Sequence, residues 1–241
     1  MNHKQFKFDW LNIIFFSLLC LLTVTAIQSW IKFYIAQQDA SADIQAYIQY
    51  NNLLTALQCI LGIISLFLPY WIRQYLAIPK TLEVCYFLFI FASVYLGEFY
   101  DFYNLIPYWD VMLHAVSGIM LSYLGLLWGI QYLTKHALPL HQVAISLFAS
   151  CTAITIGTLW EIYEFCFDGF LGLNMQKALL PDGTPLAGRY ALQDTMSDLI
   201  IDVLFACLTV WIWHSKQKKC SSSTISDIMP DNEIISIDNE T

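Results

Sequence analysis

The chain has 241 residues, of which 58% are hydrophobic and only 12% are charged, and its mean hydropathy is +0.56. This composition excludes an ordinary soluble domain of this size and is typical of a protein that crosses a membrane several times. The formal net charge is −8 and no basic stripe is present, so the expected partner is the lipid bilayer and no nucleic acid is expected.

Six apolar runs are each long enough to cross, as a helix, a hydrocarbon core of about 30 Å. They cover residues 10–31, 53–72, 81–97, 111–133, 142–163 and 196–214. We therefore predict an all-α, polytopic bundle of six transmembrane helices within residues 1–219. Residues 220–241 hold several acids and few large apolar side chains, which predicts a disordered acidic tail.

The Lys and Arg residues are distributed unevenly between the two sides of such a bundle. One side would carry Lys4, Lys7, Arg73, Lys80, Lys135, Lys216, Lys218 and Lys219, and the other only Lys32, Lys177 and Arg189. The positive-inside rule then places both termini in the cytoplasm and turns the loops 32–52, 98–110 and 164–195 outward. The first span could instead be a signal peptide, but its apolar character continues through Trp30 and Tyr34, which favours an uncleaved anchor.

Carboxylates gather at the outward ends of spans three to six, together with one histidine. They are Glu98 and Asp101 in the third, Asp110 with His114 in the fourth, Glu161, Glu164 and Asp168 in the fifth, and Asp194, Asp198 and Asp202 in the sixth. Residues three, four, seven or eight positions apart share one helical face. The acids of span five therefore form one stripe and those of span six a second, and Asp110 and His114 point the same way.

These acids have few partners in the sequence. Asp202 lies roughly 12 Å along the helix from Asp194, at a depth where a carboxylate costs about 2.5–3.5 kcal/mol and usually faces the bundle interior. The predicted spans three to six contain no Lys or Arg, and the outer loops offer only Lys177 and Arg189. Neighbouring carboxylates would repel one another unless they take up protons or bind a cation.

A divalent cation is the ligand that this set of residues favours. Carboxylate oxygens with one imidazole suit Mg²⁺, Mn²⁺, Ca²⁺, Zn²⁺ or non-haem iron, whereas the dispersed cysteines, with no CxxC, argue against a thiolate zinc site. The expected metal ligands are Asp110, His114, Asp194 and Asp198, and the supporting acids are Glu98, Asp101, Asp168 and Asp202. The simpler alternatives are that the acids of span five only cap a helix end in water and that His114 is a structural histidine.

Two features concern the arrangement of the helices. The motif E-x-Y-acid-F occurs at Glu98–Phe102 and again at Glu161–Phe165, each followed by a loop and a helix that opens with an acid, which suggests a duplicated helical hairpin of spans 3–4 and 5–6. Matches this short also arise by chance. Gly118, Gly125 and Gly129 form a small-residue face that predicts a central, closely packed fourth span.

Three stretches, LGEFYDFYNLIPYWDVMLHAVSG, TLWEIYEFCFDGFLG and ALQDTMSDLIIDVLFA, resemble the YjdF-like bacterial inner-membrane proteins over roughly residues 50–215. The features associated with that family fall on Glu161 and Glu164, on Asp110 and His114, and on Gln193, Asp194 and Asp198. The resemblance implies a multi-pass protein of the bacterial inner membrane. It supplies no activity, because the family lacks an established molecular function.

The leading hypothesis is an outward-facing, metal-dependent enzyme that acts on a lipid-linked or phosphorylated substrate, with Glu161 or Glu164 as the general base. A cation- or proton-coupled transporter, with Asp198 and Asp202 on the inward pathway, is the second hypothesis. Against it, no matching acids are expected in the cytoplasmic halves of the spans and no span is clearly broken. The third is a non-catalytic assembly or sensing protein whose acids bind Ca²⁺ or a basic partner.

Overall fold

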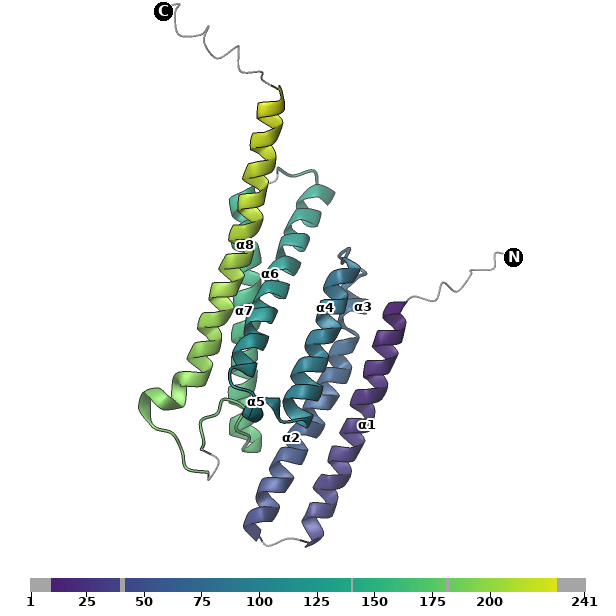
Figure 1. Ribbon diagram of the computed structural model, residues 1–241, viewed down its shortest axis with the longest axis vertical. Helices are drawn as coiled ribbons and strands as arrows, with labels where there is room; N and C mark the ends of the chain where they lie inside the picture. Colours follow the sequence, from purple (N-terminus) through teal and green to yellow (C-terminus); the bar gives the residue numbers. More distant parts are fainter. Residues whose placement is uncertain (1–9, 40–41, 140, 181–182, 229–241) are drawn as a thin grey trace, which may run out of the picture.

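The computed structural model describes residues 10–39, 42–139, 141–180 and 183–228, and these residues are mainly helical (Figure 1). Within the described ranges the one pairing of β type is a bridge between Leu179 and Pro185. The long helices are α1 (Trp10–Asp39), α2 (Ala42–Leu66), α4 (Lys80–Ile90), α6 (Trp109–Lys135), α7 (Gln142–Leu171) and α8 (Gln193–Ile228). Short helices are α3 (Leu68–Ile72), the π-helix η1 (Phe91–Phe99), α5 (Phe102–Leu105) and the 3₁₀-helix η2 (Gly188–Leu192).

Six stretches of the described chain are long and apolar enough to cross a membrane, which confirms the predicted all-α membrane bundle. They are Trp10–Ile35, Asn52–Ile72, Lys80–Phe99, Trp109–Lys135, Gln142–Leu171 and Gly188–Gln217. Most of them extend beyond the apolar runs because polar residues at the ends continue the helix. Helix α8 continues to Ile228, past the expected start of the acidic tail, and residues 229–241 lie outside the described residues.

The helices pack in two groups that meet along the chain's third span (Figure 1). In the first group, α1 and α2 pack on each other and on α4 and η1, around an apolar core that includes Leu22, Cys59 and Phe87. In the second, α6, α7 and α8 each pack on the other two, around a core that includes Leu126 and Ala149. Helix α6 also contacts α4, η1 and α5, so it is central, as its small-residue face predicts.

Helix α1 begins and α8 ends on the same side of the bundle, toward the top of Figure 1, whereas the loops after η1 and α7 lie at the opposite end. We call that opposite end, with residues 98–110 and 164–195, the acidic end. An even number of passes explains this arrangement. Every candidate site residue lies within these ranges or within two helical turns of them.

The third span is continuous but is not a uniform α-helix. Helix α4 continues directly into the π-helix η1, which ends beside Glu98 at the acidic end. A π-helical segment widens the backbone and is frequent at functional sites. The second E-x-Y-acid-F motif, at Glu161–Phe165, lies within the continuous helix α7, so the two motifs differ in backbone and the duplication stays a prediction.

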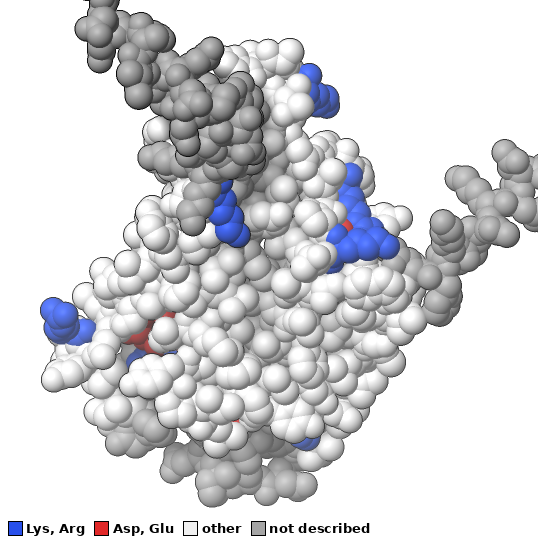
Figure 2. Space-filling view, turned by 45° about the horizontal axis from the view of Figure 1, so that its top comes forward, with Lys and Arg blue, Asp and Glu red and all other residues white. Residues whose placement is uncertain are grey.

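One acid lies in the other half of the bundle, where none was expected. Glu83, in the first turn of α4, is 2% exposed and accepts hydrogen bonds from the guanidinium of Arg73. Glu83 has its own base in the preceding loop, and the two form a structural ion pair in which the carboxylate is buried and the guanidinium is exposed. Among the described acids, Glu83, Glu161, Asp198 and Asp202 are buried, and the face in Figure 2 is mostly white, with separate blue patches and only small areas of red.

The small-residue face of α6 gives a stability prediction. A Cβ atom at Gly125 would lie 2.8 Å from Cα of Ala149 on α7, whereas one at Gly129 would meet nothing closer than 3.5 Å. Gly125→Ala is expected to destabilise the protein by about 1–3 kcal/mol, the usual cost of overpacking. Gly129→Ala is the matched control and is expected to be neutral or slightly stabilising, because alanine is the better helix former.

Thermal unfolding of both variants in detergent measures this difference. Equal melting temperatures for the Gly125→Ala and Gly129→Ala proteins would show that the close approach of α6 and α7 does not limit stability.

Candidate functional site

His114 is the centre of a buried polar cluster formed by α6, α7 and α8. Asp110 and His114 lie one turn apart on α6, Glu161 lies on α7, and Asp198 and Asp202 lie one turn apart on α8. The exposed fractions are 7% for His114, 4% for Glu161, 2% for Asp198 and 3% for Asp202. The helical spacing seen in the sequence therefore directs these side chains into the space between three helices and away from lipid.

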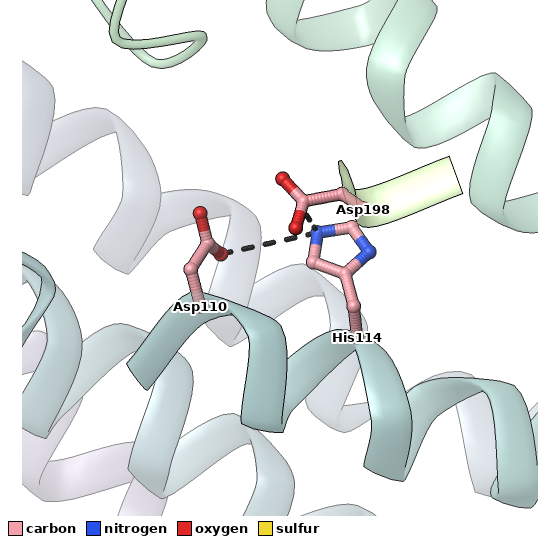
Figure 3. Close-up of side chains that lie close together, drawn as sticks. All are labelled: Asp110, His114 and Asp198. Atoms are coloured by element: carbon pink, nitrogen blue, oxygen red, sulfur yellow. Dashed lines mark ion pairs between the residues drawn. The ribbon is translucent and has the colours of Figure 1, made fainter. Parts of the chain in front are cut away.

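Three carboxylates face one nitrogen of this histidine. From Nε2 of His114, the nearest carboxylate oxygens are those of Glu161 at 3.7 Å, Asp110 at 3.9 Å and Asp198 at 4.0 Å. Figure 3 shows that Asp110 and Asp198 approach the same ring nitrogen. These distances exceed those of hydrogen bonds, so the four groups surround a common space without closing on one another.

The other ring nitrogen is held by Asp202. Nδ1 of His114 lies 3.3 Å from Oδ2 of Asp202, and the hydroxyl of Ser117 donates to Oδ1 of Asp202 at 3.4 Å and to the carbonyl of His114 at 2.9 Å. Donation from Nδ1 to Asp202 corresponds to the tautomer in which Nδ1 carries the proton. In a neutral imidazole, Nε2 then presents its lone pair to the three facing carboxylates.

Glu161 is the least satisfied member of the cluster. Both of its carboxylate oxygens are buried, and neither meets the distance and angle of a hydrogen bond with a described residue, although the hydroxyl of Thr195 lies close enough to stabilise the charge of Glu161. A buried carboxylate without full hydrogen bonds is costly, because it has lost its hydration and gained little in exchange. Such a group needs a proton or a cation.

Lys177, one of the few basic residues in the loops of the acidic end, also contacts the cluster. Nζ of Lys177, in the loop between α7 and η2, lies 2.5 Å from Oδ2 of Asp110 and 2.9 Å from Oδ1 of Asp194. Burial by itself lowers the pKa of an ammonium group, but the charges of Asp110 and Asp194 outweigh it, and the pKa of Lys177 is raised above its ordinary value. Lys177 therefore stays charged, and Asp194 is paired with it.

The site lies in a part of the chain that relatives share. The sequence matches the DUF2238 family, described as predicted membrane proteins, over residues 17–219. The chain belongs to the DUF2238 family. An uncharacterized protein of Thermotoga maritima is 32% identical over 134 residues, 55% of this chain and 61% of that protein, so the chain spans about three fifths of the length of this curated relative. No solved structure matches the chain.

In this DUF2238 protein the predicted ligand set is brought together in part. Asp110, His114 and Asp198 each offer one ligand atom, and these atoms all lie within 4.8 Å of one another. The fourth predicted ligand, Asp194, lies one turn before Asp198 and contacts Lys177. The sequence could not separate the two aspartates, because they share a helical face.

The remaining predicted acids have other local partners. Glu164 accepts a hydrogen bond from Nε1 of Trp160, and Asp101 accepts one from the side chain of Asn104. Asp168 accepts hydrogen bonds from two backbone N–H groups of the following loop. The charged neighbours of Glu98 are Asp101, Asp110 and Lys177, which places Glu98 beside the outer part of the cluster.

Tyr103 is a site neighbour that sequence reasoning missed. Its ring lies directly against Gly97, where a Cβ atom would be 2.4 Å from Cε2 of the tyrosine. Burial, and next the charges of Glu98 and Asp110, raise the pKa of Tyr103 well above its ordinary value. Nothing in the sequence distinguishes this tyrosine from the many others at span ends, whereas the sequence identifies Lys177 as one of two bases in the loops beside the acids, without indicating which acid it contacts.

Proposed function

We propose that this DUF2238 protein is a membrane enzyme that uses a divalent cation to act on a lipid-linked or phosphorylated substrate. The observation that carries the proposal is the orientation of the His114 ring. Its Nδ1 is held by Asp202, and its Nε2 faces carboxylates from three helices. A carboxylate that orients a metal-binding histidine through its second nitrogen is a recurrent feature of metal sites.

The proposal includes the finer assignments that the sequence favours. The protein is taken as a YjdF-like member of the bacterial inner membrane, with both termini in the cytoplasm and the acidic end outward. An excess of Lys and Arg toward the end where α1 begins supports this orientation. The site then lies near the outer headgroups, where the phosphate of a lipid-linked substrate is located.

The donor set fits a catalytic metal site. Asp110, His114 and Asp198 supply two oxygen donors and one nitrogen donor, and three protein ligands leave a coordination position for water or substrate. Mg²⁺, Mn²⁺, Ca²⁺ and Zn²⁺ all accept such donors. A cation in this position would polarise a substrate oxygen or lower the pKa of a bound water.

Glu161 is the better candidate for the general base. Its oxygens make no competing hydrogen bond in the described structure and face the histidine at 3.7 Å, whereas Glu164 is engaged by Trp160. Glu161 would accept a proton from the attacking water or hydroxyl group and later return it to the leaving group. Asp202 and Ser117 would hold the imidazole in its orientation through the reaction.

A transporter is supported less well. The one observation in its favour is the π-helix η1, because transporter sites are often formed by irregular membrane helices. Beyond Asp202, the space between α6, α7 and α8 is filled by the apolar side chains of Leu126, Ile145, Ala149 and Val210. The acid in the other half, Glu83, is already paired with Arg73. An ion would meet an apolar barrier immediately below the cluster.

Two aspartates on one helix test the proposal. Purified full-length protein is expected to bind Mn²⁺, and Asp198→Asn is expected to weaken binding by at least the roughly 10- to 100-fold typical of a damaged metal site. Asp194→Asn, one turn away and paired with Lys177, is the matched control and should retain the ion. Phosphatidic acid and a polyprenyl phosphate in mixed micelles serve as substrate probes.

Glu161→Gln separates binding from chemistry. This variant should keep Mn²⁺ but lose about 10²- to 10⁴-fold in the rate of phosphate release, the usual contribution of a general base. A wild-type protein that binds none of the four candidate cations, even after dialysis against each, would exclude the proposed enzyme.

A further inference from the structure

Lys177 places a positive charge between two carboxylates at the outer turn of the cluster. Its ammonium contacts Asp110 from α6 and Asp194 from α8, so it joins two helices that lie far apart in the sequence. Asp110 is shared: its Oδ2 contacts Lys177, and its Oδ1 lies on the side of His114 Nε2, at 3.9 Å. A carboxylate that bridges two cations is the arrangement found where two metal ions lie about 3.5–4 Å apart.

The loop that carries Lys177 is held firmly in the position that this contact requires. The carboxylate of Asp168 accepts hydrogen bonds from the N–H groups of Met175, at 2.8 Å, and Gln176, at 3.0 Å. The side chain of Gln176 donates to Oγ1 of Thr195 on α8 at 2.8 Å. Lys177 itself has a φ of 49°, in the left-handed region of backbone conformation, which residues other than glycine rarely adopt.

The cluster still holds more carboxyl groups than bases with the lysine in place. Glu161 is 4% exposed, makes no hydrogen bond of normal geometry with a described residue, and faces the inner position beside His114. That unsatisfied carboxylate indicates a ligand at the inner position, whereas the outer pair, Asp110 and Asp194, already has its cation. The two positions therefore differ in what fills them.

We infer that the site takes one divalent cation, at the inner position, and that the ammonium of Lys177 permanently fills a second, outer cation position between Asp110 and Asp194. The inner part of this inference rests on the proposed function. The outer part does not, since it concerns a carboxylate pair whose occupant is visible. Removing the ammonium leaves two facing carboxylates from different helices, and oxygen pairs of this kind bind divalent cations.

Counting bound Mn²⁺ per chain tests the inference. The probe is Mn²⁺ alone, titrated into purified full-length protein in detergent, with free Mn²⁺ measured by electron paramagnetic resonance. Wild type is expected to bind one equivalent and Lys177→Met two. Lys177→Arg keeps the charge and should bind one, as should Arg189→Met, which removes a base from the same outer region.

The second equivalent is assigned by a double variant. In Lys177→Met combined with Asp194→Asn, binding should return to one equivalent, because the outer pair has lost a carboxylate. Lys177→Gln, which can still donate a hydrogen bond to Asp110 or Asp194, repeats the test if the methionine variant does not fold. Circular dichroism and size-exclusion chromatography identify the folded variants.

The outcomes separate this inference from the proposed function. Two equivalents in wild type, or one in both wild type and folded lysine variants, would overturn the inference and leave the proposed function standing. No equivalent in wild type, but one in Lys177→Met that Asp194→Asn removes, would uphold the outer position and overturn the proposed function. No binding in any variant would overturn both.

Discussion

Purified His114→Ala protein is expected to lose divalent-cation binding altogether over the range in which wild type is saturated. The imidazole is the one nitrogen donor of the inner position, and its Nε2 lies 3.9 Å from Asp110 and 4.0 Å from Asp198, the two carboxylates that would share the ion. Without the imidazole, the carboxylates still repel one another, and the proposed metal site loses its nitrogen ligand. Isothermal titration with Mn²⁺ and with Zn²⁺ measures the change in affinity.

Asp202→Asn should also weaken divalent-cation binding, but less than His114→Ala does. This substitution keeps the volume of the side chain but allows an amide to donate toward Nδ1, so the hydrogen bond that orients the ring is no longer specified. The expected loss of affinity is about 10- to 100-fold, as for other outer-shell partners of a metal-binding histidine.

His141→Ala is the matched control for these variants, because His141 is exposed just before α7, at the end of the bundle remote from the acidic end. It should bind metal as wild type does. Wild-type affinity in folded His114→Ala protein would show that the imidazole is a structural group and that the ion, if any, is bound elsewhere.

Gly157→Ala is expected to damage both stability and the site. A Cβ atom at Gly157 on α7 would lie 2.2 Å from Oδ2 of Asp202, closer than any real contact, and that oxygen is the one that holds Nδ1 of His114. Either Asp202 must turn away from the histidine or α7 must move away from α8. Overpacking of this kind costs about 1–3 kcal/mol, and displacement of Asp202 adds a loss of metal affinity.

Gly169→Ala, on the same helix, provides the comparison. Nothing lies within 4 Å of a Cβ atom built there, so the substitution should be neutral or should stabilise the helix by up to roughly 1 kcal/mol. Thermal melting in detergent, with and without Mn²⁺, measures both effects. The contradicting result is a Gly157→Ala protein with the melting temperature of Gly169→Ala protein and the same increase in that temperature with Mn²⁺. That result would show that neither stability nor metal binding needs the close packing of α7 against Asp202.

The two glycine comparisons show why the fourth and fifth spans carry small residues where they do. Gly125 lets α6 approach α7 at Ala149, and Gly157, at the middle of α7, leaves room for the carboxylate of Asp202. The first role is packing between helices in lipid, where small residues permit close contact. The second role serves the site, because a larger residue would expel the acid that orients His114.

Sequence alone determined the class of the protein and the content of its site. The hydrophobic composition and six apolar runs require a bundle of membrane helices, because only helices satisfy the backbone across a bilayer within one segment. Helical periodicity predicted that Asp110 and His114 share a face and that Asp198 and Asp202 share another, and the positions of these side chains agree with it. The physical reason is local: both features depend on neighbours within two turns of one helix.

Only the tertiary structure decided how each acid is used. Asp194 and Asp198 are equivalent by periodicity, yet one contacts Lys177 and the other faces His114, because a loop that follows α7 brings the ammonium to the outer turn. Glu83, an acid in the half of the bundle where the sequence predicts none, is paired with Arg73. Such assignments depend on distances between residues far apart in the chain, which no local pattern of apolar and polar residues encodes.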